Sequence, residues 1–218
     1  MKILLLGATG RTGKLVIEEA IRRGHKISAI ARDPEKLKDY QIDITQGTPY
    51  DYNTVEKAFS GCEAVINTLN ISRKTENPWS RLTAPKDLIS RSATNAISAM
   101  ERAGIKRFIA LSTIGAGSSW RKAPLILKLI VSISNLKYAF RDHGTQESML
   151  QNSDMDYTIC RAPMLTNEMN IKGVVAVKED EIPPRPVLSR NAAANFFINI
   201  IENNNNIKQT VNLSNSDL

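Results

Sequence analysis

The sequence of 218 residues lacks the patterns that mark several classes of protein. It has only two cysteines and no zinc-ligand spacing, so we expect neither a disulfide framework nor a metal site. Cys62 and Cys160 lie in apolar stretches, which is typical of buried, reduced thiols. The absence of a Gly-x-x-x-x-Gly-Lys loop and of a Gly-x-Ser-x-Gly turn argues against a nucleoside triphosphatase and an α/β-hydrolase.

Long charged runs are absent as well. The net charge of +7 would suit nucleic acid, an anionic membrane surface or an anionic cofactor. Because the Lys and Arg residues are scattered, we expect no nucleic-acid partner, and a phosphate-rich cofactor needs only a few of these charges. Met1 and Lys2 lead directly into an apolar strand, so we expect no signal peptide, no membrane span and a cytoplasmic protein.

The N-terminus holds the most informative pattern. Residues 3–6 form a continuous apolar run, as expected for a strand buried on both faces of a parallel sheet. Gly7, Gly10 and Gly13 follow with the spacing Gly-x-x-Gly-x-x-Gly, and residues 14–24 have helical periodicity. The glycines therefore lie in a turn between a strand and a helix.

Each glycine of this turn has a physical reason for its position. Gly7 permits a tight turn, Gly10 lets a pyrophosphate approach the backbone, and Gly13 lets the helix lie close to the strand. The helix N-terminus offers free N–H groups to phosphates. We therefore predict a dinucleotide site, with a ligand-free glycine turn as the alternative. The residues expected to bind the cofactor here are Gly7, Thr9, Gly10, Arg11, Thr12 and Gly13.

The second strand, residues 26–31, is followed directly by Arg32. At this position an acidic residue binds the ribose 2′-hydroxyl of NAD, whereas an arginine accommodates the 2′-phosphate of NADP. Arg32 therefore favours NADP(H), the alternative being a solvated loop charge. Asp33 is expected to cap a short helix that begins at Pro34.

Strands and helices alternate along the whole chain without repeats or a linker. This alternation predicts a single-domain, Rossmann-like α/β fold over residues 1–218, with a doubly wound, mostly parallel sheet. The helix at 52–59 is expected to be capped by Asp51, and the helix ending near 103 to be stopped by Gly104. Residues 171–180 read as a short strand and residues 210–213 as a final edge strand.

The motif Gly-Ala-Thr-Gly-x-Thr-Gly at the N-terminus resembles the atypical short-chain dehydrogenase/reductase group. Within it, the chain looks most like the NmrA-like and biliverdin reductase B (flavin reductase)-type NAD(P)H-binding proteins. The resemblance places further cofactor contacts at the ends of the third and fourth strands. At the first of these, Gly47-Thr48-Pro49 stands where the family has Gly-Asp-Val or Gly-Asp-Leu, so Thr48 and Pro49 are the expected contacts. At the second, Asn70 replaces a glycine beside Leu69, and asparagine tolerates a positive φ.

The resemblance also implies a catalytic role for the end of the fifth strand. Short-chain dehydrogenases keep their catalytic serine there, next to the nicotinamide. Ser112 is therefore our candidate catalytic hydroxyl, and both Ser112 and Thr113 are expected to contact the cofactor. The alternative for Ser112 is an ordinary strand-end hydroxyl.

The usual Tyr-x-x-x-Lys pair of these enzymes is missing. Tyr138 is followed four residues later by Asp142, and a carboxylate would raise rather than lower the pKa of a nearby tyrosine. Instead, Asp142-His143 with Glu147 matches the NmrA-like and flavin-reductase pattern, in which the histidine lies beside the nicotinamide. His143 is our second candidate catalytic and cofactor-binding residue, the alternative being a structural histidine oriented by Glu147.

The sixth strand ends in Arg161-Ala162-Pro163, close to the two-proline version of the flavin-reductase type. The resemblance implies that the backbone of Met164 and Leu165 passes the nicotinamide carboxamide.

Two irregular segments, 70–86 and 115–137, are expected to form the substrate pocket. Within the second, residues 125–131 are almost all apolar but too few to span a bilayer. This stretch reads as a buried helix, a lid or a subunit interface, and we favour a lid or pocket wall. Residues 124–136 also offer a surface for an oligomer contact or a protein partner.

Two functions fit this sequence. The first is an NADPH-dependent oxidoreductase that transfers hydride to a planar small-molecule acceptor such as a flavin, quinone or conjugated carbonyl. The second is an NmrA-like regulator that binds NADP(H) without turnover. An epimerase that holds NAD is disfavoured by Arg32 and by the missing Tyr-x-x-x-Lys pair.

Overall fold

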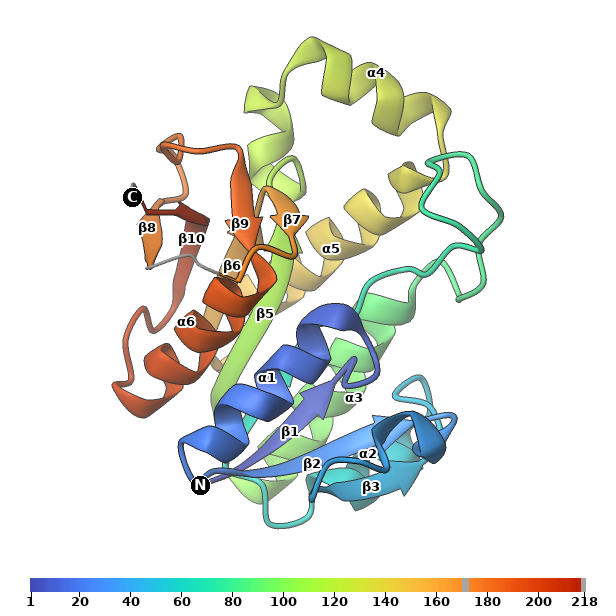
Figure 1. Ribbon diagram of the computed structural model, residues 1–218, viewed down its shortest axis with the longest axis vertical. Coiled ribbons are helices and arrows are strands. Elements are labelled where there is room, and N and C mark those ends of the chain that lie inside the picture. The colour runs from blue at the N-terminus through green and yellow to red at the C-terminus, as the bar shows by residue number, and fades with distance from the viewer. Residues whose placement is uncertain (170–172, 217–218) are drawn as a thin grey trace.

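An eight-stranded sheet forms the centre of the protein (Figure 1). The computed structural model describes residues 1–169 and 173–216. The strands of the sheet are β1 (Lys2–Leu6), β2 (Lys26–Ala31), β3 (Asp43–Gln46), β4 (Ala64–Asn67), β5 (Arg107–Thr113), β6 (Asp156–Ala162), β8 (Val174–Lys178) and β10 (Gln209–Asn215). Their order is β3-β2-β1-β4-β5-β6-β10-β8, and only the β10–β8 pair is antiparallel.

Six α-helices connect and cover these strands. They are α1 (Arg11–Arg22), α2 (Tyr52–Phe59), α3 (Leu88–Ala103), α4 (Leu125–Ile133), α5 (Leu136–Gln151) and α6 (Arg190–Glu202). Two short 3₁₀ helices, η1 (Pro34–Leu37) and η2 (Gly117–Lys122), and a separate parallel pair, β7 (Met164–Thr166) with β9 (Val187–Ser189), complete the described elements.

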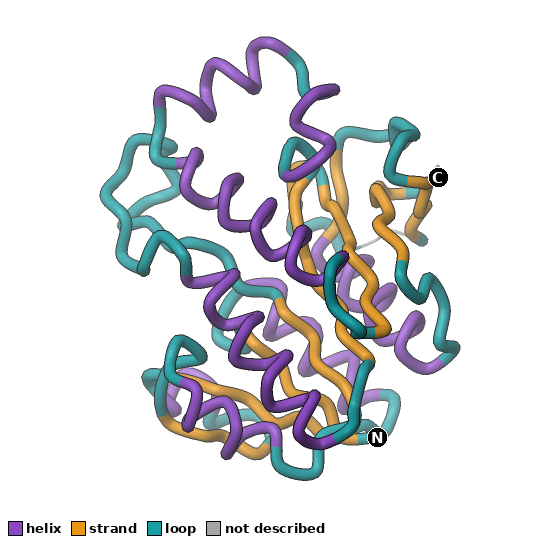
Figure 2. Tube along the Cα trace, turned by 180° about the vertical axis from the view of Figure 1, so that it is seen from behind, coloured by secondary structure: helices purple, strands orange, loops and turns teal. Residues whose placement is uncertain are grey.

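Five of the described α-helices lie in two layers, one on each face of the sheet, and α4 lies beyond one end of it (Figures 1 and 2). Helices α1 and α6 pack together on one face, while α2, α3 and α5 cover the other. The apolar run of β1 serves both faces, because Ile3 and Leu5 enter the first core and Leu4 and Leu6 enter the second. This explains why the strand is hydrophobic at every position.

The arrangement confirms the predicted fold class. The six strands from β3 to β6 have the order of a doubly wound nucleotide-binding sheet, and the order reverses between β1 and β4. In open parallel sheets, ligands bind outside the carboxyl ends of the strands at such a reversal. The fold therefore directs attention to the turn after β1.

Several local predictions are confirmed. β2 occupies residues 26–31 as expected. Asp51 caps α2 by accepting a 2.8 Å hydrogen bond from the backbone N–H of Thr54. Gly104 ends α3 in the left-handed conformation, with φ of 69°.

Other local predictions are wrong. Helix α1 begins at Arg11, so the last part of the expected turn is already helical. Asp33 precedes η1 but makes no side-chain capping bond. Strand β10 is not at an edge, because β8 pairs with it and forms that edge. Asn70 has no positive φ; its side-chain Oδ1 instead accepts a 2.8 Å hydrogen bond from the N–H of Ile71.

The strand expected over residues 171–180 is β8, which occupies Val174–Lys178; residues 171 and 172 lie outside the described residues. Among the helices that the structure describes, none has the length and apolar content needed to cross a membrane.

Candidate functional site

A cleft of about 510 Å³ lies at the carboxyl ends of the central strands. The turn between β1 and α1 forms one wall, and the ends of β2 and β4 form the floor. The segment after β4 reaches over it, through residues 72–76 and 84–85. The cleft therefore occupies the point at which the strand order reverses.

The glycine turn is shaped by close backbone contacts. Gly7 has a φ of 86°, and a Cβ there would lie 2.8 Å from Thr68 Oγ1. A Cβ on Gly13 would lie 2.8 Å from the Cα of Ala8 and would collide with the backbone of Gly7. Gly13 therefore lets α1 lie close to β1, as the sequence predicted, although it does not itself line the cleft.

Positive charge surrounds the cleft. Gly10 precedes α1, the first turn of which holds no acidic residue, so the positive end of the helix dipole faces this region uncompensated. The cleft-lining residues include one carboxylate, Glu76, whose Oε1 lies 2.8 Å from Nη1 of Arg11. The cationic side chains that line the cleft are Arg11, Arg32, Arg73, Lys74 and Arg190. This surrounding suits an anionic ligand with several phosphates.

Burial makes two of these guanidinium groups costly to keep charged. It lowers the pKa of Arg73. It also lowers the pKa of Arg190, which Arg11 repels in addition. An anion in the cleft would relieve both effects.

The structure brings most of the expected cofactor residues together. Those that line the cleft are Gly7, Thr9, Gly10, Arg11, Thr12, Arg32, Thr48, Pro49, Leu69, Asn70 and Leu165. The expected residues outside its lining are Gly13, Ser112, Thr113, His143 and Met164. The first group lines one cleft, and the second group includes both candidate catalytic residues.

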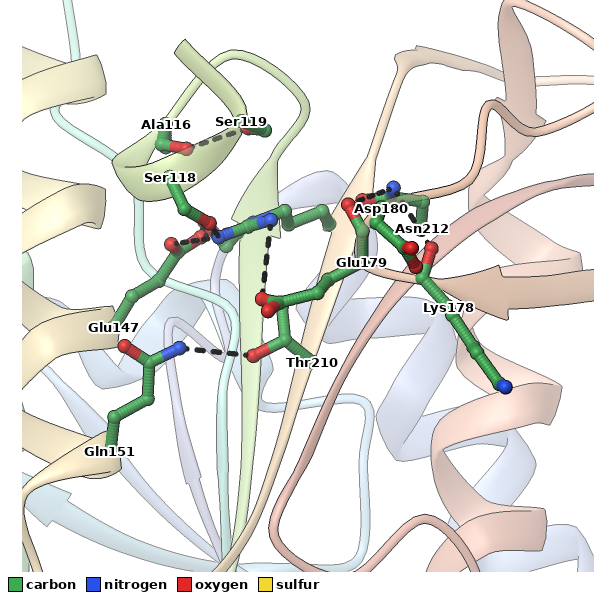
Figure 3. A network of polar contacts seen from close by, with 12 residues as sticks. Ala116, Ser118, Ser119, Glu147, Gln151, Lys178, Glu179, Asp180, Thr210 and Asn212 are labelled. Carbon is green, nitrogen blue, oxygen red and sulfur yellow. Dashed lines mark hydrogen bonds and ion pairs between the residues drawn. The ribbon is translucent and has the colours of Figure 1, made fainter. Parts of the chain in front are cut away.

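Ser112 is buried and its hydroxyl is already engaged. It donates a 2.6 Å hydrogen bond to Oε1 of Glu147 on α5. Glu147 in turn accepts hydrogen bonds from Nε (3.0 Å) and Nη2 (2.7 Å) of Arg161, whose side chain is fully buried. Arg161 also donates to Ser118, in the network around Glu147 and Ser118 that Figure 3 shows. Ser112 therefore belongs to a buried ion-pair network between β5, β6 and α5.

Thr113 lies on the opposite face of β5 from Ser112. Side chains alternate along a strand, so Thr113 shares its face with Leu111, which lines the cleft. Its hydroxyl makes only a long contact, 3.4 Å, to the carbonyl of Ile114. Of the two neighbouring hydroxyls, that of Thr113 is the less engaged.

His143 is buried on the inner face of α5. Among the described residues, its Nδ1 has no hydrogen-bond partner. Burial lowers the pKa of this imidazole to about 4, so it is neutral at pH 7. Glu147 does not orient it, because that carboxylate binds Ser112 and Arg161.

Asp142, the other member of the Asp-His pair, has a function that the sequence did not reveal. Its carboxylate accepts a 2.7 Å hydrogen bond from the N–H of Ile89, and it also binds the N–H and hydroxyl of Ser90. Asp142 thereby caps the start of α3, where Asp87 makes no side-chain cap. Burial raises its pKa. Nothing in the sequence signals this contact, because Asp87 already stands at the expected cap position.

A second cavity, of about 1060 Å³, lies between η2, α4 and α5. Trp120, Val131 and Phe140 supply apolar lining, and Arg141 is among its polar residues. It shares no lining residue with the cleft. The segments 70–86 and 115–137, expected to form one pocket, therefore contribute to different cavities.

Comparison with known proteins identifies the family of the chain. A family model described as NAD(P)H-binding matches residues 7–204, from the first glycine of the turn to beyond α6. The chain belongs to this NAD(P)H-binding family. The cleft of this family member accordingly lies where a nicotinamide nucleotide binds in a doubly wound sheet.

Individual relatives differ in their described functions. Ycf39 of Synechocystis, a photosystem II assembly factor, is 28% identical over 162 residues, which cover 73% of this chain and 43% of Ycf39. The chain thus spans less than half the length of Ycf39. YhfK of Bacillus subtilis, described as an uncharacterized sugar epimerase, is 28% identical over 227 residues, covering 100% of this chain and 95% of YhfK.

A solved structure shows the same fold. ChuY of Escherichia coli O157:H7, described as an anaerobillin reductase, has a TM-score of 0.82 at 22% identity, covering 100% of this chain and 98% of ChuY. The family match confirms the expected resemblance to NAD(P)H-binding proteins, and the ChuY structure shows that the fold is shared.

Proposed function

We propose that the protein is an NADPH-dependent oxidoreductase that transfers hydride to a planar acceptor such as a flavin, quinone or conjugated carbonyl. The observation that carries the proposal is the position of Arg32, an exposed guanidinium at the end of β2 that lines the same cleft as the glycine turn. A 2′-phosphate belongs at this position.

In this proposal, different residues of the cleft bind different parts of the nucleotide. The N-terminus of α1 and Arg11 would hold the pyrophosphate, and Arg32 the 2′-phosphate. Thr48 and Pro49 would line the adenine side, while Leu69, Asn70 and Leu165 would lie along the ribose and nicotinamide. The bound nucleotide supplies the hydride, and the protein aligns it with the acceptor.

Thr113, rather than Ser112, is the strand-end hydroxyl that we assign to the acceptor. Ser112 acts by holding the end of β5 through Glu147. His143, buried and neutral, is assigned a structural role in α5. A planar acceptor that takes hydride directly has little need of a strong protein acid, and solvent can supply the proton. This agrees with the missing tyrosine–lysine pair.

The relatives support a reductase in general terms. The family is NAD(P)H-binding, and the ChuY structure is described as a reductase. We do not infer the acceptor of this chain from that of ChuY, because 22% identity supports only a shared fold.

A second candidate is a sensor that binds NADP(H) without turnover. It is favoured by the engagement of Ser112 with Glu147 and by the burial of His143, which leave the expected catalytic pair away from the cleft. The sensor would use the same nucleotide contacts.

Turnover distinguishes the two candidates. The purified protein is mixed with NADPH and, in separate reactions, dichlorophenolindophenol, a free flavin and a soluble quinone, and the loss of NADPH absorbance is followed. Oxidation that requires protein and acceptor supports the reductase. Nucleotide binding without oxidation by any of these acceptors supports the sensor.

A further inference from the structure

Helix α4 exposes an unusual amount of apolar surface. Leu125 is 83% exposed, Ile126 70%, Leu129 60% and Ile133 58%. Four large aliphatic side chains thus face solvent on a helix of nine residues. Contiguous apolar surface of this kind marks an interaction site.

The four side chains form one stripe. At about 100° per residue, they fall within an arc of about 100° on the helix. Val131, the one buried residue of α4, projects from the opposite side and lines the cavity against α5. The helix therefore packs on the protein with one side and presents the stripe outward.

The charged residues of the segment that carries the stripe are all cationic. Residues 102–141 contain no Asp or Glu. The segment 116–141 alone carries Arg121, Lys122, Lys128, Lys137 and Arg141. The next acidic residue, Asp142, is buried and binds the start of α3. Lys122 Nζ donates a 2.8 Å hydrogen bond to the carbonyl of Asp180, so the acidic segment 179–181 lies beside one edge of this region. The segment with the stripe itself combines apolar side chains with cations, which makes it complementary to an anionic, apolar surface.

A tryptophan lies beside the helix. Asn135, just after α4, donates from its backbone N–H to Pro78 O (2.9 Å) and from Nδ2 to Trp79 O (3.1 Å). These bonds hold the loop of Trp79 next to the end of α4, with the indole 55% exposed. Tryptophan is favoured at the boundary between headgroups and acyl chains.

The position of α4 leaves the stripe accessible. The helix lies at one end of the longest axis of the molecule, and the N-terminus lies toward the other (Figure 1). Figure 2 shows the same helix from behind, at the same extremity. A flat surface can therefore meet α4 without meeting the rest of the sheet.

We propose that α4, with Trp79, is a docking surface for an anionic lipid bilayer. Leu125, Ile126, Leu129 and Ile133 would enter the headgroup boundary, and Arg121 and Lys122 would contact lipid phosphates. A bilayer fits better than a second copy of the chain or another protein, because residues 116–141 supply five cations and no carboxylate of their own to set a register.

The full-length protein is sedimented with vesicles of equal parts phosphatidylcholine and phosphatidylglycerol, and with vesicles of phosphatidylcholine alone. We expect binding to the mixed vesicles that exceeds binding to neutral vesicles by about tenfold or more and that weakens with added salt. Equal binding to both kinds of vesicle, or binding to neither, overturns the proposal.

Two variants locate the surface. Leu125→Ser combined with Leu129→Ser removes exposed apolar groups, and Arg121→Glu combined with Lys122→Glu reverses two charges. Each is expected to weaken binding to the mixed vesicles by about tenfold or more. Ile21→Ser, at an isoleucine that is 41% exposed on α1, is the control and should bind normally.

Circular dichroism of each variant verifies folding before the comparison. If both variants are folded and bind vesicles like the control, another surface carries the binding and the proposal is wrong. Light scattering tests whether the stripe is a self-association surface instead. That would be the conclusion if the unmodified chain is a dimer and does not bind vesicles, and if Leu125→Ser combined with Leu129→Ser dissociates the dimer.

Discussion

The hydroxyl of Ser112 lies 2.6 Å from Oε1 of Glu147 and donates a hydrogen bond to it. Because Glu147 also binds the buried guanidinium of Arg161, the serine at the end of β5 is one member of a buried ion-pair network. Its neighbour Thr113 points to the other face of the strand, which it shares with the cleft-lining Leu111. The two adjacent hydroxyls thus have different surroundings.

This division predicts different effects of two conservative substitutions. Thr113→Val should lower turnover with an artificial acceptor by about tenfold or more, with NADPH affinity nearly unchanged, because the acceptor loses a hydrogen bond. Ser112→Ala should lower stability and leave turnover of the folded enzyme largely intact. Steady-state kinetics and urea unfolding of both variants test this. A loss of turnover confined to Ser112→Ala would reverse the assignment.

The buried ion pair predicts a large effect on stability. Glu147→Gln leaves the guanidinium of Arg161 buried without a counter-charge at its 2.7 Å contact, so we expect the free energy of unfolding to fall by about 3 kcal/mol. Urea denaturation measures it.

The matched control is Glu56→Gln, which removes the charge from an exposed pair with Arg102. Its expected cost is below about 1 kcal/mol. Similar losses in the two variants would show that the Glu147–Arg161 pair contributes no more than a surface pair.

His143 makes stability depend on pH. Its folded-state pKa of about 4 lies below the ordinary value of about 6.5, so the unfolded chain binds more protons between these values. Stability should therefore fall as pH falls from about 6.5 to about 4, by up to about 3 kcal/mol from this residue. His143→Gln should flatten that part of the profile in urea titrations at several pH values. An unchanged slope in the variant would show that other groups cause it.

The glycine turn predicts a contrast between two of its members. Gly13→Ala would place a Cβ against the backbone of Gly7, and overpacking of this kind costs about 1–3 kcal/mol. Gly10→Ala meets only Gly7 O, at 3.1 Å, so it should remain stable while its methyl group obstructs the pyrophosphate. Thermal unfolding, followed by NADPH titration, separates the effects. A stable Gly13→Ala protein would contradict the close approach of α1 to β1.

Much of the fold was predictable from local signals. The apolar run of residues 3–6, the cap at Asp51 and the stop at Gly104 each act within a few residues, and the structure confirms them. The glycine turn and Arg32 were recognisable for the same reason, because both follow directly from strands with clear patterns.

The rest depends on partners that are distant in the sequence. Asp142 caps a helix that begins more than fifty residues earlier, and the periodicity of the sequence does not predict such a contact. Either Ser112 or Thr113 could share the face of β5 that holds the cleft-lining Leu111. The choice depends on the pleat of β5 within the sheet, and it cannot be read from two adjacent hydroxyl residues in the sequence. β10 is an inner strand because β8 pairs with it in an antiparallel direction on its outer side. The apolar run of residues 125–131 was compatible with a buried helix, a lid or a subunit interface, and its composition did not show that four of the side chains of α4 face solvent.

Titration with NADPH and NADH tests the central claim most directly. Nucleotide fluorescence is followed on the unmodified protein, on Arg32→Ala, and on Lys36→Ala as a control at an exposed cation outside the cleft lining. We predict that the unmodified protein and Lys36→Ala prefer NADPH, and that Arg32→Ala loses about tenfold or more in NADPH affinity while keeping its NADH affinity. Failure of the unmodified protein to bind either nucleotide would contradict the assignment of the cleft, and an unchanged NADPH preference in Arg32→Ala would contradict the function given to Arg32.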